Sequence, residues 1–403
     1  MNWNFFKELL CSDSTSGKER EVAQWLLTQL EAPVVESMEV GDGTLNLFLK
    51  WGTPKVVFCT HMDTVPPYIA PGFPEEILSR GHVHPRTWVG GGARCIQVPE
   101  GDEVDNGRGR SERSERSSSG EHLLRITGRG SCDAKGQLFA MYTACKELEA
   151  GGCTDFGLLL LAGEETGSWG AKAFSKTGFQ APFLIVGEPT ENRMVSASKG
   201  TKSYDLTFRG EAFHSGYPQY GVSAVDLFNA FYNQLKAKDF GEDPILGATT
   251  WNVGLLHSDN PQNILSPELT CRLYFRTTFV SDQAVQDWMG QVAEGIGLSG
   301  TFARTGSRSD VEERPMPSGT PGPVGGLTVT PRGGDAPARY VTLPGFPSAP
   351  VAFGSDAPHL TGFGHKIICG PGTIRVAHRP DEHVLVRDLE TAVVQYVKMY
   401  HAL

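Results

Sequence analysis

Short apolar runs of strand length recur along this chain, and turn residues bound each of them. The runs cover residues 56–58, 158–161, 184–186 and 367–369. Between them lie helical patterns, with apolar side chains at spacings of three and four residues, such as Leu138, Met141, Cys145 and Leu148. Buried strands that alternate with helices are typical of α/β proteins. We therefore predict an α/β fold with a mixed, largely parallel sheet flanked by helices.

The pattern changes between residues 201 and 305. Strand-like segments at 203–209, 250–256 and 269–277 accompany helical segments at 224–235 and 283–296, and a closing strand is expected near 300–304. This order predicts a small α+β domain of the ferredoxin-like type, inserted at 201–305 into the larger one. The larger domain is then discontinuous and comprises residues 1–200 and 306–403.

Two stretches, 90–121 and 307–345, fit neither domain. Both are rich in Gly, Pro, Ser and charges of alternating sign. Such a composition buries too little apolar surface to offset the entropy lost on ordering. We predict that both are flexible surface insertions.

Composition excludes some classes of partner. The net charge of -10 disfavours non-specific binding to nucleic acid or to anionic membranes. No apolar run approaches the ~20 residues that span a bilayer. Lys7 and Glu8 interrupt the first apolar stretch, which favours a helix over a secretion signal. The eight cysteines lack paired spacing, so we expect reduced thiols in a cytoplasmic protein.

Side chains that bind metal ions follow three of the apolar runs. His61 and Asp63 follow the first run, the adjacent pair Glu164 and Glu165 follows the second, and Glu188 follows the third. In open parallel sheets, ligands bind at the carboxyl ends of the strands. An acidic pair is usually a solvated loop, but this pair ends a buried strand, which favours a functional role.

Two further residues extend this set. Asp133 stands between a glycine-rich turn and a helical pattern, where a helix N-cap explains it equally well. His378 follows another glycine-rich turn after the last apolar run. Histidines with carboxylates form a donor set suited to zinc, cobalt or manganese. In the pair Glu164–Glu165, one carboxylate can bind a metal ion while the other acts on water.

Six motifs in this order carry a family resemblance: THMDTVP, GRGSCDAKG, AGEETGSWGA, VGEPT, AFHSGYPQYGVSAV and GPGTIRVAH. Together they resemble the zinc metallopeptidase and amidohydrolase family. That family includes aminoacylase-1, glutamate carboxypeptidase, succinyl-diaminopimelate desuccinylase and acetylornithine deacetylase. The resemblance covers nearly all of the chain except the two insertions.

The resemblance implies a pair of Zn²⁺ ions, with Co²⁺ or Mn²⁺ as substitutes. By the same resemblance, His61 and Glu188 hold one ion and Glu165 and His378 hold the other, while Asp133 bridges them. The larger domain is then the metal-binding catalytic domain, with a fold like that of zinc exopeptidases.

The resemblance also implies roles in catalysis. Glu164 is the general base that takes a proton from the metal-activated water. Asp63 orients His61. His214 stabilises the oxyanion and comes from a partner subunit, which implies a homodimer formed through the inserted lid and dimerisation domain.

Four residues are expected at the substrate. Asn263 and Arg276 match the family residues that bind the substrate carboxylate, a task that suits the planar guanidinium. A surface salt bridge is the alternative for Arg276. Gly354 and Ser355, in the stretch FGSDAPHL, are expected near the substrate pocket.

These features predict a hydrolase that removes the acyl group from a small N-acyl amino acid. FGSDAPHL looks closer to the acetylornithine deacetylase form than to the desuccinylase form, which would place the enzyme in amino-acid and specifically arginine biosynthesis. A di- or tripeptidase or carboxypeptidase acting on short peptides is the first alternative. A catalytically silent metal-binding scaffold is the second, and the retention of Glu164 beside the five ligands argues against it.

Overall fold

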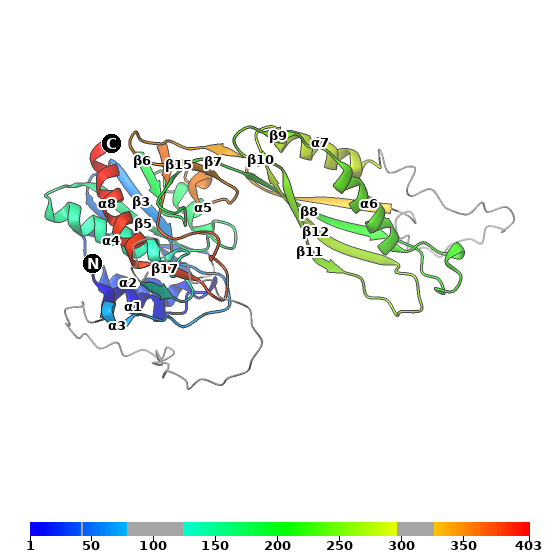
Figure 1. Cartoon of the computed structure of the whole chain (residues 1–403), viewed down its shortest axis with the longest axis horizontal. Coiled ribbons are helices and arrows are strands. Elements are labelled where there is room, and N and C mark those ends of the chain that lie inside the picture. The colour runs from blue at the N-terminus through cyan, green and yellow to red at the C-terminus, as the bar shows by residue number, and fades with distance from the viewer. Residues whose placement is uncertain (42, 79–123, 296–325) are drawn as a thin grey trace, which may run out of the picture. The chain divides into compact units, whose positions relative to one another are not determined.

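A computed structural model describes residues 1–41, 43–78, 124–295 and 326–403 (Figure 1). The chain forms two compact units. The larger unit comprises Met1–Ser196, Tyr340–Ala349 and Ser355–Leu403, and the smaller unit comprises Ala197–Arg339 and Pro350–Gly354. The larger unit is therefore discontinuous in sequence. The smaller unit extends to Arg339, beyond the boundary expected at 305, and the insertion expected at 90–121 lies outside the described residues.

A six-stranded sheet of order β1-β2-β5-β3-β6-β16 forms the centre of the larger unit. Its strands are β1 (Val34–Val40), β2 (Thr44–Gly52), β3 (Val56–His61), β5 (Asp155–Leu161), β6 (Ala181–Val186) and β16 (Phe363–Ile368). Strands β5, β3, β6 and β16 are parallel, and the hairpin β1–β2 adds an antiparallel edge. The predicted α/β class and the mixed, largely parallel sheet are confirmed.

Helices cover both faces of this sheet. The helices α1 (Trp3–Cys11), α2 (Glu19–Gln29), α4 (Lys135–Ala150) and α8 (Val386–Ala402) share one apolar core with the strands. The fully buried Leu158 and Leu160 of β5 face this core. The short helix α5 (Trp169–Ser175) packs on β1 and β2 through contacts such as Phe174 on Phe48. Because successive strand residues point to opposite faces and both faces of β5 are covered, residues 158–161 are all apolar and fully buried.

Short elements complete the larger unit. Helix α3 (Glu75–Leu78) lies near α1, and β4 (Arg125–Thr127) pairs with β17 (His383–Leu385). A single 3-10 turn, η2, covers Ala357–His359. Strands β7 (Met194–Ser198), β14 (Ala338–Arg339) and β15 (Ser348–Val351) form a separate three-stranded sheet of order β14-β7-β15.

The smaller unit contains an antiparallel sheet of order β11-β12-β8-β13. Its strands are β8 (Gly200–Arg209), β11 (Thr250–His257), β12 (Glu268–Thr277) and β13 (Gly326–Gly333). Helices α6 (Ala224–Ala237) and α7 (Asp282–Ala293) share an apolar core with the sheet. The 3-10 turn η1 (Pro218–Tyr220) and the strands β9 (Glu242–Asp243) and β10 (Gly247–Ala248) lie in its loops. Its role as a lid and dimerisation domain stays a prediction.

Strand β13 corrects the expectation of a flexible insertion over 307–345. Residues 326–333 pair with β8 from Gly326↔Arg209 to Gly333↔Ser203. Leu327 and Val329 pack against the core of the smaller unit, because alternate residues of the strand face it. Pro331 is tolerated because β13 is an edge strand. The closing strand expected near 300–304 lies outside the described residues.

Two further predictions can be compared with the structure. In the described residues, six cysteines are free thiols: Cys59, Cys132, Cys145, Cys153, Cys271 and Cys369. Cys11 is disulfide-bonded, so the prediction that all eight thiols are reduced is wrong at this position, because spacing along the chain does not report which thiols the fold brings together. Among the helices of the described ranges, none has the length and apolar composition needed to cross a bilayer.

Candidate metal centre

The central strands bring the predicted metal-binding side chains to one edge of the sheet. His61 is the last residue of β3 and pairs in parallel with Leu161, three residues before Glu164. On the other side of β3, Cys59 pairs with Val186, two residues before Glu188. The parallel register therefore places His61, Glu164 and Glu188 at the carboxyl ends of neighbouring strands.

Two groups of three side chains form at this edge. His61, Asp133 and Glu188 form one group, and Asp133, Glu165 and His378 form the other; in each, one ligand atom per residue lies within 4.8 Å of the others. The structure thus brings all five predicted ligands together, and both groups share Asp133. Two cations bridged by one carboxylate need this arrangement, and imidazole with carboxylate oxygens suits zinc.

Asp133 faces a histidine with each of its oxygens. Its Oδ1 lies 3.2 Å from Nε2 of His61, and its Oδ2 lies 3.3 Å from Nε2 of His378. His378 also lies 2.9 Å from Oε1 of Glu165. Hydrogen bonding to Asp133 and then to Glu165 raises the pKa of His378 to about 10. Asp133 and Glu165, which form a candidate metal group with His378, therefore also hold its imidazole in place.

His61 is oriented through its other nitrogen. Nδ1 lies 3.0 Å from the backbone oxygen of Asp63 and 3.4 Å from that residue's Oδ1. When Nδ1 carries the proton and donates it to the backbone oxygen of Asp63, Nε2 is left free to bind a cation. Burial disfavours the charged imidazole, but the bonds to Asp133 and Asp63 outweigh it and raise the pKa of His61.

Negative charge is concentrated at this edge. Burial raises the pKa of Glu188 well above its usual range, and the neighbouring Glu164 and Asp133 raise it further. Burial also raises the pKa of Glu164, although His61 partly opposes this effect. Buried carboxylates are stable as anions only when cations compensate them. The donor set therefore fits a pair of divalent cations.

Glu164 lies within the reach of the same edge. It forms a third group with His61 and Glu165, in which the ligand atoms also lie within 4.8 Å of one another. Distance alone thus makes Glu164 either a ligand or a base, and its role as general base stays a prediction. The turn that carries it ends at α5, which begins at Trp169.

The substrate residues predicted in the smaller unit fall into two places. The exposed His214 and Asn263 are neighbours, since the N–H of Ser215 donates to the backbone oxygen of Asn263 at 2.9 Å. Arg276 lies near the far end of β12, opposite Thr201, with its guanidinium 5.0 Å from the ring centre of Tyr274. In the described part of the chain, Arg276 forms no ion pair, so the salt-bridge alternative has no support.

The segment after β15 carries the other predicted substrate residues. Gly354 is exposed and belongs to the smaller unit, whereas Ser355 is buried in the larger one. The Ser355 hydroxyl accepts the N–H of Ala357 at 3.3 Å. Burial raises the pKa of the next residue, Asp356, to about 6, and His61 and a hydrogen bond from Ser168 oppose the shift. Contact of Gly354 and Ser355 with substrate stays a prediction.

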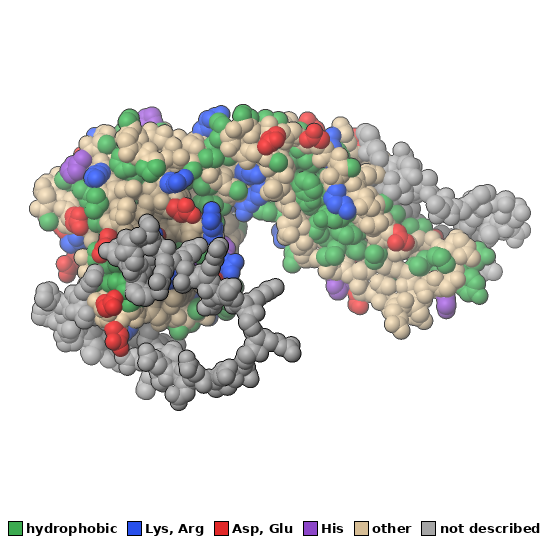
Figure 2. Space-filling view, viewed as in Figure 1, with side chains coloured by type: hydrophobic (Ala, Val, Ile, Leu, Met, Phe, Trp, Pro, Cys, Tyr) green, Lys and Arg blue, Asp and Glu red, His purple; other side chains and the backbone are tan. Residues whose placement is uncertain are grey.

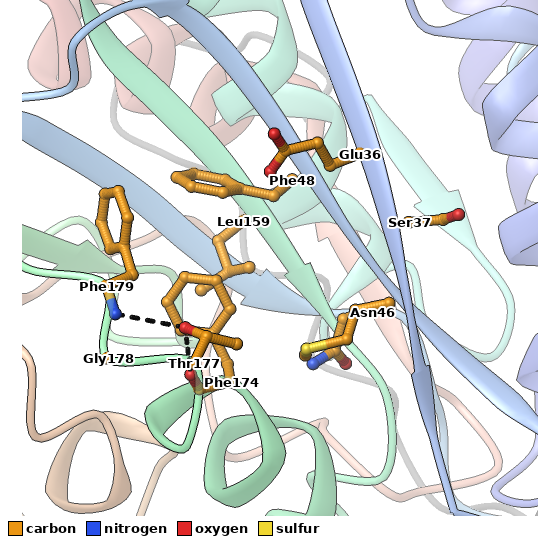
Figure 3. A pocket seen from close by; sticks show the side chains of 10 residues that line it. Glu36, Ser37, Asn46, Phe48, Leu159, Phe174, Thr177, Gly178 and Phe179 are labelled. Atoms are coloured by element: carbon orange, nitrogen blue, oxygen red, sulfur yellow. Dashed lines mark hydrogen bonds between the residues drawn. The ribbon is translucent and has the colours of Figure 1, made fainter.

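A pocket of about 490 Å³ lies on the face of the sheet covered by α5. Figure 3 shows Phe48, Phe174 and Phe179 beside one another in its lining, and the Thr177 hydroxyl is hydrogen-bonded to the backbone of the last two. Asn46 lines the pocket, and its amide donates to the backbone oxygen of Gly170 and accepts the N–H of Ala162. The pocket contains none of the predicted ligands.

Sequence reasoning missed the contacts that two carboxylates make at this edge. The carboxylate of Asp63 accepts the backbone N–H groups of Glu164 and Glu165 as well as the hydroxyl of Ser16. The buried Glu382 binds the turn that carries Asp133. The position of Glu382, a charged residue four positions after His378, could have drawn attention to it. Nothing in the sequence indicated which groups it contacts.

Known proteins resemble this chain over most of its length. The sequence profile of peptidase family M20/M25/M40 matches residues 98–402. A protein of Aspergillus clavatus named a probable carboxypeptidase is 28% identical, over 98% of this chain and 86% of the relative.

Solved structures share the fold. A tripeptidase from Staphylococcus aureus superposes with a TM-score of 0.66 at 16% identity, covering 98% of this chain and 96% of that one. A family M20 metallo-carboxypeptidase from Sulfolobus solfataricus gives a TM-score of 0.63 at 14% identity, covering 99% and 98%. At these identities the likeness concerns the fold alone.

Proposed function

The chain belongs to peptidase family M20/M25/M40 and is a metal-dependent hydrolase of amide bonds; on that premise, we propose that it is a peptidase acting on short peptides. The arrangement that carries the proposal is the pair of ligand groups that share Asp133, with Glu164 beside them. The names of the relatives support a peptidase better than the acetylornithine deacetylase-like enzyme that the sequence favoured.

The proposed centre holds two zinc ions, with cobalt or manganese as substitutes. When bound, the cations supply a water molecule that is nucleophilic near neutral pH. His61 and Glu188 would hold one cation and Glu165 and His378 the other, with Asp133 as the carboxylate common to the two groups. Asp63 keeps Nε2 of His61 directed at its cation through the contact at Nδ1.

Glu164 handles the proton in this mechanism. It takes a proton from the attacking water as the new bond to the peptide carbonyl carbon forms. When the carbon–nitrogen bond breaks, the same carboxyl group gives that proton to the leaving amine. Glu164 is half-buried, and the desolvation raises the pKa of its carboxyl group, which suits a group that must both accept and release a proton.

Arg276 is the proposed partner of the peptide's free carboxylate. Its guanidinium can make two parallel hydrogen bonds to a carboxylate, and no acidic side chain of the described residues occupies it. Asn263 cannot share this role within one copy of the smaller unit. The eight residue steps from Glu268 to Arg276 span about 26 Å of strand β12, and Asn263 lies beyond the Glu268 end.

A second copy of the chain is the proposed source of His214 and Asn263. Apolar side chains gather on the visible face of the smaller unit (Figure 2). Near His214, Phe213, Tyr217 and Tyr220 are exposed by 39%, 55% and 60%, and the ring of Tyr220 lies 5.4 Å from that of Phe213 and 6.5 Å from that of Tyr217. These side chains support dimerisation through the smaller unit.

A substrate panel tests the proposed function. The protein is stripped of metal, reloaded with zinc or cobalt, and assayed on dipeptides and tripeptides, on the same peptides with amidated carboxyl termini, and on N-acetylornithine. The proposal expects hydrolysis of the free peptides and strong loss on amidation. Hydrolysis of N-acetylornithine alone would establish the deacylase, and metal binding without any turnover would establish a silent scaffold.

A further inference from the structure

Glu382 lies between two elements of the candidate centre. It follows His378 by four residues and directly precedes β17, and only 1% of its surface is exposed. Its Oε1 accepts backbone N–H groups from Gly130 at 2.9 Å, from Cys132 at 3.2 Å and from Asp133 at 3.2 Å. Three donors from one turn thus converge on one carboxylate oxygen.

These hydrogen bonds fix the turn up to the residue that bears the shared carboxylate. Hydrogen bonds to a charged acceptor are stronger than those between neutral groups, and successive N–H groups around one anion form a rigid concave site. The turn is also closed on itself, since Ser131 donates its N–H to Gly128 at 3.1 Å. Gly130 has a φ of 84°, and a Cβ there would lie 2.9 Å from the Lys135 side chain. The backbone leading to Asp133 therefore has little freedom.

The second oxygen of Glu382 extends the network to other segments. It accepts a hydrogen bond from Nη1 of Arg129, whose side chain is 2% exposed. The Arg129 Nε donates to the backbone oxygen of Pro67 at 3.2 Å, in the segment that follows His61. Nη1 also lies 3.5 Å from the backbone oxygen of Arg379, next to His378. One buried ion pair therefore joins the three segments that carry His61, Asp133 and His378.

We propose that Glu382 is a positioning residue for the metal centre. It holds the Asp133 backbone where one carboxylate oxygen faces His61 and the other faces His378, at 3.2 and 3.3 Å. The inference rests on the proposed function, because it assigns Glu382 to the cation pair that Asp133 bridges. A shift of the turn would move one carboxylate oxygen of Asp133 away from its histidine. Asp133 could then no longer contribute equally to both ligand groups.

A purely structural ion pair would behave differently. Its loss would lower the thermal stability of the unit, while each folded molecule kept its affinity for zinc and its turnover. A positioning role also predicts lower metal affinity and lower kcat in folded protein. KM should change little, because Glu382 does not contact the substrate in this account.

Two substitutions separate these roles. Glu382→Leu keeps the side chain's bulk and removes every acceptor. Glu382→Gln keeps a single acceptor oxygen, which can serve either the three N–H groups or Arg129 but not both. The matched control is Tyr400→Phe, which removes a hydroxyl that donates to Asp155 at the opposite end of β5 from Glu164.

The test measures zinc affinity by competition with a chromophoric chelator, and kcat and KM on the best peptide at saturating zinc. For folded Glu382→Leu we expect affinity at one or both positions and kcat to fall by about 10- to 100-fold, the usual effect of losing a group that orients metal ligands. Glu382→Gln should lose less, and Tyr400→Phe should match the wild type.

Wild-type affinity and kcat in folded Glu382→Leu would overturn the inference. If Glu382→Leu does not fold, Glu382→Gln decides the question by the same two measurements, and wild-type values for both would overturn it. Failure of the wild-type protein to bind zinc or cleave any peptide would instead overturn the proposed function, so the two failures are distinguishable.

Discussion

The Oδ1 atom of Asp63 accepts the backbone N–H of Glu164 at 3.0 Å. Its Oδ2 accepts the next N–H, that of Glu165, at 3.1 Å, and the hydroxyl of Ser16 at 3.0 Å. The carboxylate is fully buried. Asp63 therefore orients the turn that carries the proposed base as well as the imidazole of His61.

This contact predicts the effect of Asp63→Asn. The amide presents an NH₂ group to one of the two backbone N–H donors, so the turn must move or lose a hydrogen bond. We expect kcat to fall by about 10- to 100-fold with nearly unchanged secondary structure. Peptide kinetics and far-UV circular dichroism measure the two effects. Wild-type kcat in folded protein would contradict this role of Asp63.

Glu164→Gln tests the proposed base. The amide keeps the shape of the side chain but cannot take a proton, so we expect kcat to fall by about 10²- to 10⁴-fold while two zinc ions remain bound. Glu147→Gln, an exposed carboxylate on α4, is the matched control and should retain wild-type kcat. Loss of zinc from Glu164→Gln would show that Glu164 is a metal ligand. The structure allows this role, because the ligand atoms of Glu164, His61 and Glu165 also lie within 4.8 Å of one another.

The shared carboxylate predicts different metal contents for two variants. His378 belongs to one ligand group, whereas Asp133 belongs to both. His378→Ala should therefore retain about one zinc ion per chain after dialysis, and Asp133→Ala should lose most of both. Elemental analysis of the dialysed proteins gives the counts. Equal zinc content in the two variants would argue against a bridging role.

Zinc binding should also depend on pH. Hydrogen bonds to Asp133 and Glu165 raise the pKa of His378 to about 10, so below that pH the free imidazole holds a proton that zinc must displace. Zinc affinity should therefore rise with pH, by about tenfold per pH unit for one displaced proton. Calorimetry in buffers of different ionisation enthalpy measures the protons released. Zinc binding without proton release at pH 7 would contradict this account.

The central sheet and the ligand cluster could be predicted from the sequence for one physical reason. Residues that follow parallel strands meet at one edge of the sheet, so the order of the apolar runs is enough to group His61, Glu165 and Glu188. Asp133 was ambiguous, because an N-cap and a metal ligand use the same residue type at the same place. The shared motifs, rather than local pattern, resolved it.

Other features left no usable signal. Strand β13 was hidden because Gly and Pro in residues 326–333 are typical of loops, and only pairing with β8 makes it a strand. The hydrogen bonds of Asp63 and Glu382 go to backbone N–H groups about a hundred and 250 residues away. A backbone donor has no residue-type signature, so these partners could be found only in the fold.

Whether two cations share Asp133 can be seen by anomalous diffraction at the zinc absorption edge from crystals of the zinc-loaded protein. We expect two peaks, one beside His61 and Glu188 and one beside Glu165 and His378, with Asp133 in contact with both. A single peak, or a pair of peaks that Asp133 does not join, would contradict this expectation.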